Sequence, residues 1–350
     1  MKKILLAISL FIFLTNLALA VNSTSVPADP NEMDFAVGRA TKIQDKNTTF
    51  EFLDGRLVEV QVDPEFITTA NQKPVLGEKF VLGRFDVEGK MVWQIYDHYR
   101  LAALLGIFAI FVAILIAVGG WRGFTALLGL AASIGLILFG IIPALAASYP
   151  PLWVGLAGCV LIAGVTIFLA HGFNFRSWLA FLATLATLAV STGLAIFFTN
   201  FASLFGTGTE ESFYLTSGVF QNLDLKGLLL AGILLGALGV LDDITVAEVT
   251  TAEELILANP SLSRREIFKR SLRVGREHIA SMVNTLALAY AGVALPLILL
   301  FAVDGNQPLW ALLNSEFAAE EIVRTLVGSL ALVLAAPLAS ALGAFFLKKK

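Results

Sequence analysis

The sequence predicts an α-helical membrane bundle of about seven transmembrane helices, preceded by a small N-terminal all-β domain. Of its 350 residues, 57% are hydrophobic and 15% are charged, and the mean hydropathy is +0.81. A soluble domain is about half apolar and a quarter charged, so this composition indicates an integral membrane protein. The apolar residues also gather in runs that reach the roughly 20 residues needed to cross a bilayer.

Residues 1–20 are typical of a secretory signal peptide. The pair Lys2-Lys3 precedes an apolar run that begins at Ile4, and Ala18-Leu19-Ala20 has the small-residue pattern of a cleavage site. An uncleaved membrane anchor is the alternative interpretation. Residues 21–33 are expected to form a polar linker, because they include proline and serine.

Residues 34–98 predict a compact β domain, either a small barrel or a sandwich. Two alternating runs flank Asp54-Gly55, which is a strong hairpin signal, and a second hairpin is expected around Glu88-Gly89. The domain is near the lower size limit for independent folding. We expect its tether to the membrane to help stabilise it.

Residues 99–350 form the predicted transmembrane domain. Its apolar segments are Leu101–Val118, Phe124–Ala147, Leu152–Ala170, Trp178–Thr199, Gly227–Leu241, Ile279–Ala302 and Ile322–Leu347. The fifth segment is short, so its helix either continues to about Ala247 or starts earlier and tilts. A cytoplasmic helical segment is expected over 246–278. Capping-box patterns at Thr251–Glu254 and Ser263–Glu266 predict two helices there, separated by the breaker Asn259-Pro260.

The distribution of basic residues predicts the orientation. If the β domain is outside, the external ends of the helices carry only Arg100, Lys226 and Arg324. The cytoplasmic side then carries Arg122, Arg176, Arg264, Arg265, Lys269, Arg270, Arg273, Arg276 and Lys348-Lys349-Lys350. This positive-inside bias agrees with the signal peptide and predicts an external N-terminal domain and a cytoplasmic C-terminus.

Two adjacent carboxylates, Asp242 and Asp243, end the fifth apolar run. Ionisable groups at such a position are costly unless paired or hydrated, so they are candidates for function. Helical spacing suggests that one of them pairs with Arg276 of the next helix, with His278 nearby. A structural clamp at the membrane interface is the equally weighted alternative. The full set of proton-coupling, ion-coupling or clamp candidates is Asp242, Asp243, Thr245, Glu248, Arg276, His278, Asn284 and Thr285.

Several classes of function find no support in the sequence. It lacks the H-E-x-x-H, G-x-S-x-G and P-loop motifs, so no enzyme activity, catalytic residue or cofactor is predicted. The acidic and histidine spacing matches no metal motif, and the lone Cys159 lies in an apolar run as a packing residue. The basic cluster at 264–276 suits anionic lipid rather than nucleic acid.

Three motifs taken together resemble a known family. They are Ile95-Tyr96-Asp97-His98-Tyr99-Arg100, Leu238–Val246 with its two aspartates, and Gly275-Arg276-Glu277-His278 running into Val283–Gly292. In this order and spacing they are similar to the YibE/F-like family of bacterial multipass membrane proteins, over roughly residues 35–347. The resemblance implies an inner-membrane protein with an extracytoplasmic β domain. It implies no reaction, substrate or catalytic residue.

The leading hypothesis is a transporter or export permease for a small solute or ion. Asp242 and Asp243 would bind the proton or cation, Arg276 would be their counter-charge, and Asn284 and Thr285 would line the path. The alternative is a non-transporting accessory or scaffold protein whose β domain binds an envelope partner. An intramembrane enzyme is a third hypothesis. The lipid bilayer is an expected partner in every case, and a homo-oligomer stays open.

Overall fold

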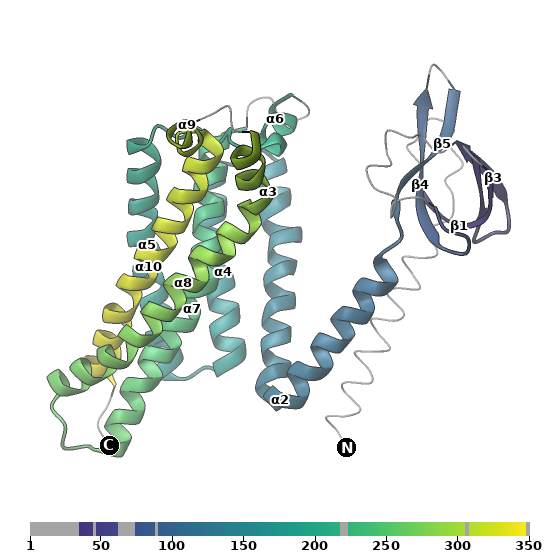
Figure 1. The fold of residues 1–350 in the computed structure, drawn as a ribbon. Helices are drawn as coiled ribbons and strands as arrows, with labels where there is room; N and C mark the ends of the chain where they lie inside the picture. Colours follow the sequence, from purple (N-terminus) through teal and green to yellow (C-terminus); the bar gives the residue numbers. More distant parts are fainter. Residues whose placement is uncertain are drawn as a thin grey trace. The chain divides into compact units, whose positions relative to one another are not determined.

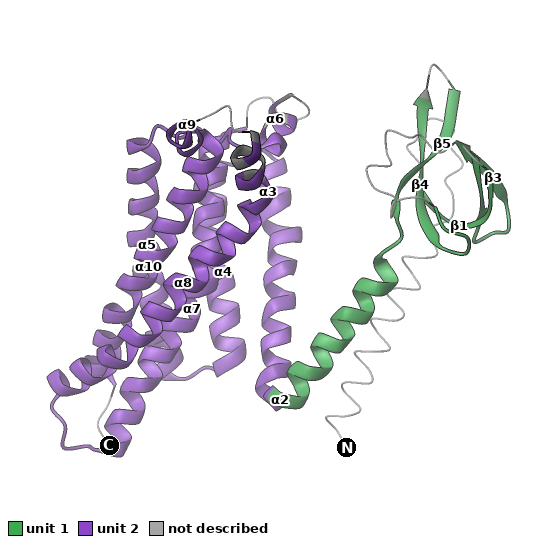
Figure 2. Ribbon diagram, viewed as in Figure 1, with its two compact units in different colours: residues 1–118 green, residues 119–350 purple. Residues whose placement is uncertain are grey.

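The computed structural model describes residues 35–44, 47–61, 74–87, 90–217, 223–304 and 308–347. The predicted signal peptide, the linker, the turn Glu88-Gly89 and the lysines at 348–350 lie outside the described residues. The chain divides into two compact units, residues 1–118 and residues 119–350 (Figure 2). The first unit therefore contains the β domain together with the start of the first long helix.

The β domain is one five-stranded antiparallel sheet. Its strands are β1 (Phe35–Gln44), β2 (Asn47–Phe52), β3 (Leu57–Gln61), β4 (Lys79–Val87) and β5 (Lys90–His98), and their order is β3-β2-β1-β4-β5. The two end strands of this order, β3 and β5, also contact each other. The sheet therefore curls toward a barrel and does not form a two-sheet sandwich.

Buried and exposed side chains alternate along the strands, and the buried ones form the core of this domain. Phe50, Phe80 and Leu82 are fully buried in it, and the rings of Phe50 and Phe80 meet edge to face. The hairpin predicted at Asp54-Gly55 is present between β2 and β3. Gly55 has a φ of 80°, which favours glycine, and Asp54 Oδ1 accepts a hydrogen bond from the backbone N–H of Arg56.

Six helices in the described residues are long and apolar enough to cross a membrane (Figure 1). The first run, Leu101–Ala146, comprises α2 (Leu101–Leu136), the π-helical turn η3 (Ile137–Ile141) and α3 (Ile142–Ala146). The others are α4 (Pro151–His171), α5 (Phe175–Phe201), α7 (Leu225–Ala258), α8 (Arg264–Asp304) and α10 (Glu316–Phe346), with short helices α6 (Glu210–Ser217) and α9 (Leu309–Leu313). The predicted membrane bundle with a β domain is thus the observed fold class.

The first two predicted spans lie within one run that is broken at Gly120. This residue has φ 56° and ψ −132°, which is not a helical conformation. Glycine adopts such a conformation readily, whereas residues with a Cβ rarely do. The six long helices therefore contain all seven of the predicted apolar segments, and the difference in number comes from this break. Sequence patterning located both arms because each is apolar along its length.

The fifth predicted span continues well beyond the aspartates. The helix α7 is unbroken to Ala258, so the predicted first cytoplasmic helix is its continuation. Thr251 is not a helix cap, because its hydroxyl donates to the Ala247 carbonyl within the helix. The second capping box is present: Glu266 Oε2 accepts from the Ser263 backbone N–H at 2.8 Å, and Ser263 Oγ accepts from the Glu266 N–H.

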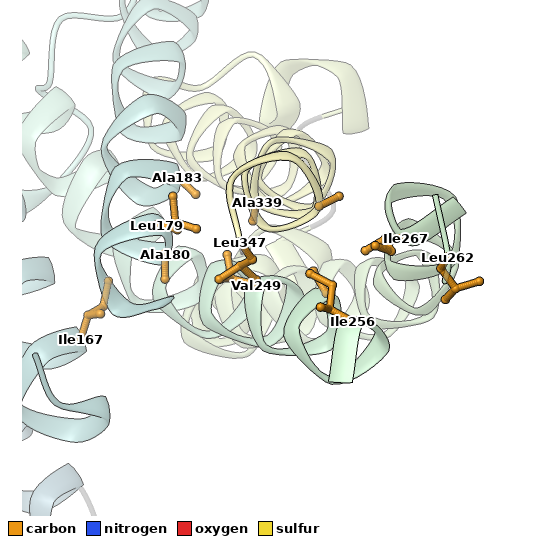
Figure 3. Packing of buried hydrophobic residues seen from close by; sticks show 12 residues of the cluster. Ile167, Leu179, Ala180, Ala183, Val249, Ile256, Leu262, Ile267, Ala339 and Leu347 are labelled. Atoms are coloured by element: carbon orange, nitrogen blue, oxygen red, sulfur yellow. The ribbon is translucent and has the colours of Figure 1, made fainter. Parts of the chain in front are cut away.

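The helix α7 is the centre of the helical unit. It contacts α4, α5, α8 and α10. Small residues allow this packing: a Cβ on Gly155 of α4 would lie 2.9 Å from the Cα of Ala231 of α7. Towards the α7–α8 turn, a buried cluster joins α4, α5, α7, α8 and α10 (Figure 3), and it contains Ile167, Leu179, Ala180, Ala183, Val249, Ile256, Leu262, Ile267, Ala339 and Leu347.

Polar clamps hold both ends of α10. At its start, Glu316 accepts hydrogen bonds from the backbone N–H groups of Phe205 and Thr207 and from the Thr207 hydroxyl. At its end, Arg264 of α8 donates to the carbonyls of Ala344, Phe345 and Leu347. Glu316 therefore fixes a loop, and one basic residue of the 264–276 cluster caps a helix.

Candidate functional site

The two aspartates of α7 point in different directions, because adjacent residues on a helix lie about 100° apart. Asp242 is partly buried, and its Oδ2 accepts a hydrogen bond of 2.6 Å from the Thr166 hydroxyl of α4. Its other oxygen, Oδ1, is buried and has no hydrogen-bond partner among the described residues. Asp243 is exposed on the helical unit. Of the pair, Asp242 is therefore the carboxylate inside the bundle.

A hydroxyl pair lies one turn further along α7. Thr245 is fully buried, and its Oγ1 lies 2.8 Å from Thr184 Oγ1 of α5. The Thr245 hydroxyl also lies 3.2 Å from the backbone carbonyl of Asp242. Asp242 and Thr245 thus belong to one polar seam at which α4, α5 and α7 meet.

Glu248 lies in a second polar seam, between α7, α8 and α10. Its side chain is fully buried, and Oε2 accepts hydrogen bonds from Ser271 of α8, at 3.1 Å, and from Ser340 of α10. Its Oε1 has no hydrogen-bond partner among the described residues, and the nearest basic atom is His278 Nδ1 at 3.9 Å. Of the predicted candidates, the structure therefore brings Glu248 and His278 together.

The predicted pairing of an aspartate with Arg276 is wrong. No ion pair within 4.0 Å joins Arg276 to Asp242 or Asp243, and the Arg276 side chain is exposed. The reason is the rotation of α8 about its own axis. Ser271 and Gly275 are buried toward α7, so Arg276, one residue further, points about 100° away from that contact.

Asn284 and Thr285 are also exposed on the helical unit. The Thr285 hydroxyl donates to the Ser281 carbonyl within α8, as threonine hydroxyls on helices commonly do. The two residues are not brought to the aspartates. Within the described ranges, no group of three or more His, Cys, Asp or Glu side chains lies close enough together to hold a metal ion.

Sequence reasoning missed the partners of the two buried carboxylates. Thr166 and Ser340 each lie in a locally apolar stretch, and nothing in the neighbouring sequence indicates which helix they face. A signal was present in α8, where Ser271, Gly275 and His278 are spaced four and three residues apart and share a face. That face, rather than the one with Arg276, packs against α7.

The comparisons with known proteins bear on the helical unit. A family model described as YibE/F-like protein matches residues 107–349. This range contains α7, α8 and α10 with both buried carboxylates, and it leaves out the β domain. Neither a curated protein nor a solved structure matches the chain significantly. Because the family model covers more than half of the chain, this multipass membrane protein belongs to the YibE/F-like family.

Proposed function

We propose that this protein is a transporter for a small solute or ion, in which Asp242 binds the coupled proton or cation and Asp243 assists it. The observation that carries the proposal is the bonding of Asp242. One oxygen is held by Thr166, and the other is buried with no partner in the described residues. Burying a carboxylate in this way is costly, and the cost is offset when the group binds a cation or proton.

A row of buried hydroxyl groups on α5 supports a path for the solute. Buried hydroxyls lie along one face of α5, at Thr184, Thr187, Ser191 and Thr199. Thr187 and Ser191 donate to carbonyls of their own helix, which leaves their oxygen lone pairs as acceptors. The buried hydroxyls of α5 are therefore concentrated on a face that packs inside the bundle, where a hydrated route would need them.

The proposed orientation places the β domain outside the cell membrane and the α7–α8 turn in the cytoplasm. The basic residues near that turn, which include Arg264, Arg265 and Arg270, support this by the positive-inside rule. Asp242 then lies near the middle of α7, about halfway between Leu225 and Ala258. No covalent step is assigned to the protein, because the proposal needs only binding and release.

The test is charge movement in proteoliposomes of the purified protein, across a panel of ions and metabolites with and without a pH gradient. We expect currents that are lost in Asp242→Asn and reduced in Asp243→Asn. Glu254→Gln is the matched control, because Glu254 is an exposed carboxylate on the same helix. Currents that persist in correctly folded Asp242→Asn would contradict the proposal.

An accessory role is the second candidate, and one observation on the β domain favours it. The rings of Phe35, Phe85 and Tyr96 cluster, with centroids 5.0 to 6.5 Å apart, while Phe35 and Tyr96 stay 46% and 62% exposed. Exposed aromatic clusters are typical of protein interfaces. A photo-crosslinker at Tyr96 should then capture one envelope protein, whereas the same probe at exposed Lys90 should not.

A further inference from the structure

The buried carboxylate of Glu248 has a cradle built for it by three helices. Ser271 of α8 and Ser340 of α10 both donate to Oε2, and both serines are fully buried. Gly275 of α8 supplies the space: a Cβ there would lie 2.6 Å from Oε1. Since a side chain at this position would displace the carboxylate, glycine is required for the close approach of α8.

The bonding within the cradle is one-sided. Both hydroxyl donors contact Oε2, whereas Oε1 is buried and without a hydrogen-bond partner among the described residues. A fully ionised carboxylate normally accepts several hydrogen bonds when it is buried. The oxygen that accepts none, Oε1, is therefore the one available to take up a proton.

His278 is the route by which a proton can reach this oxygen. Its Nδ1 lies 3.9 Å from Glu248 Oε1, while 46% of its side chain is exposed. In the described part of the chain, no other basic group lies within 4.0 Å of Glu248, and α10 contributes only Ser340. The histidine therefore reaches the outside of the helical unit on one side and faces the unpartnered oxygen Oε1 on the other.

We propose that Glu248 is a buried proton-binding site, and that His278 carries protons between it and the aqueous phase near the α7–α8 turn. In the transfer step, protonated His278 gives its Nδ1 proton to Oε1. This leaves a neutral imidazole and an uncharged carboxylic acid, and the imidazole then takes a proton from water. Imidazole is suited to this exchange near neutral pH. The ring must approach by about 1 Å to reach hydrogen-bond distance.

The site is separate from Asp242 and does not depend on the proposed transport. Glu248 lies six positions after Asp242 along α7, and the two carboxylates have different partners. Glu248 accepts from Ser271 and Ser340, whereas Asp242 accepts from Thr166. A protein that transports nothing would still bind a proton here.

The experiment is infrared difference spectroscopy of the full-length protein in phosphatidylcholine nanodiscs, between acid and alkaline pH. We expect a protonated-carboxyl band that is absent in Glu248→Gln and retained in Glu254→Gln. Ser340→Ala keeps the carboxyl but removes one hydrogen-bond donor, so it should shift the band without abolishing it. A spectrum in which Glu248→Gln leaves every carboxyl band in place would overturn the proposal.

The role of His278 is tested by the rate at which this band responds to transfer into heavy water. In His278→Ala the exchange should slow about a hundredfold, at the lower end of what a positioned proton carrier contributes. His98→Ala is the matched control, because that histidine lies on β5 of the sheet. An unchanged exchange rate in His278→Ala would overturn the assigned route.

Discussion

The Thr166 hydroxyl donates a hydrogen bond of 2.6 Å to Asp242 Oδ2. In Thr166→Val the shape is kept but Oδ2 loses this partner, so the free energy of unfolding should fall by about 1–3 kcal/mol. Thr192→Val is the control, because that hydroxyl donates only to the Leu188 carbonyl of its own helix. Chemical unfolding in detergent measures both. Equal losses in the two variants would show that Asp242 gains nothing from Thr166.

Gly275 allows a prediction about the Glu248 cradle. In Gly275→Ala the new methyl group would overlap the carboxylate, and the strain should lower the free energy of unfolding by about 1–3 kcal/mol. Gly292→Ala lies on the same helix with nothing within 4 Å of its Cβ position, so its stability should stay within about 1 kcal/mol of the wild type. A Gly275→Ala protein as stable as Gly292→Ala would contradict the described packing.

The sequence identified the buried carboxylates but not their partners. Asp242 and Asp243 stand out at the end of an apolar run, where ionisable residues are rare, whereas Glu248 was one member of the wider candidate set. Their partners depend on how each helix is rotated about its axis, and one residue of rotation exchanges Gly275 for Arg276. In a strongly apolar helix such as α4 the hydrophobic pattern does not select a face, so the rotation that directs Thr166 toward Asp242 is not encoded in periodicity.

Among the helices, α10 allows a prediction about a clamp. Glu316→Ala removes the acceptor for two backbone N–H groups and one hydroxyl, those of Phe205 and Thr207. Amide hydrogen exchange over 203–208 should therefore become faster, while exchange in α5 stays unchanged. Glu210→Ala provides the comparison, since Glu210 is an exposed carboxylate in the neighbouring α6. Unchanged exchange at 205 and 207 would contradict the clamp.

The ends of the helices could be predicted only where the sequence changes from apolar to polar or carries a capping motif. Apolar runs predicted every long helix, and the capping box at Ser263 correctly marked the start of α8. The continuation of α7 to Ala258 was missed, because the polar residues that follow Asp243 suggested a separate helix outside the membrane. In the structure, Val249, Ala252 and Ile256 continue the buried face, so packing extends the helix past the charged residues.

For the whole molecule, the orientation can be tested with the chain's own cysteine content. Cys159 is fully buried and is the single cysteine in the sequence, so an introduced cysteine will react against a low background. A membrane-impermeant thiol reagent should label Lys90→Cys in intact cells. It should label Arg265→Cys only after the membrane is opened. The reverse pattern would overturn the proposed orientation.

The helix α10 makes side-chain hydrogen bonds near both ends of the helical unit. Its first two turns hold the 205–208 segment through Glu316 and Glu320. Its second-last turn bonds Glu248 through Ser340, and its final carbonyls accept hydrogen bonds from Arg264. With 31 residues, it is a rod of about 46 Å at 1.5 Å per residue. A shift of α10 along its axis that loosened Ser340 from Glu248 would also strain the hydrogen bonds of Glu316 to the loop at the opposite end.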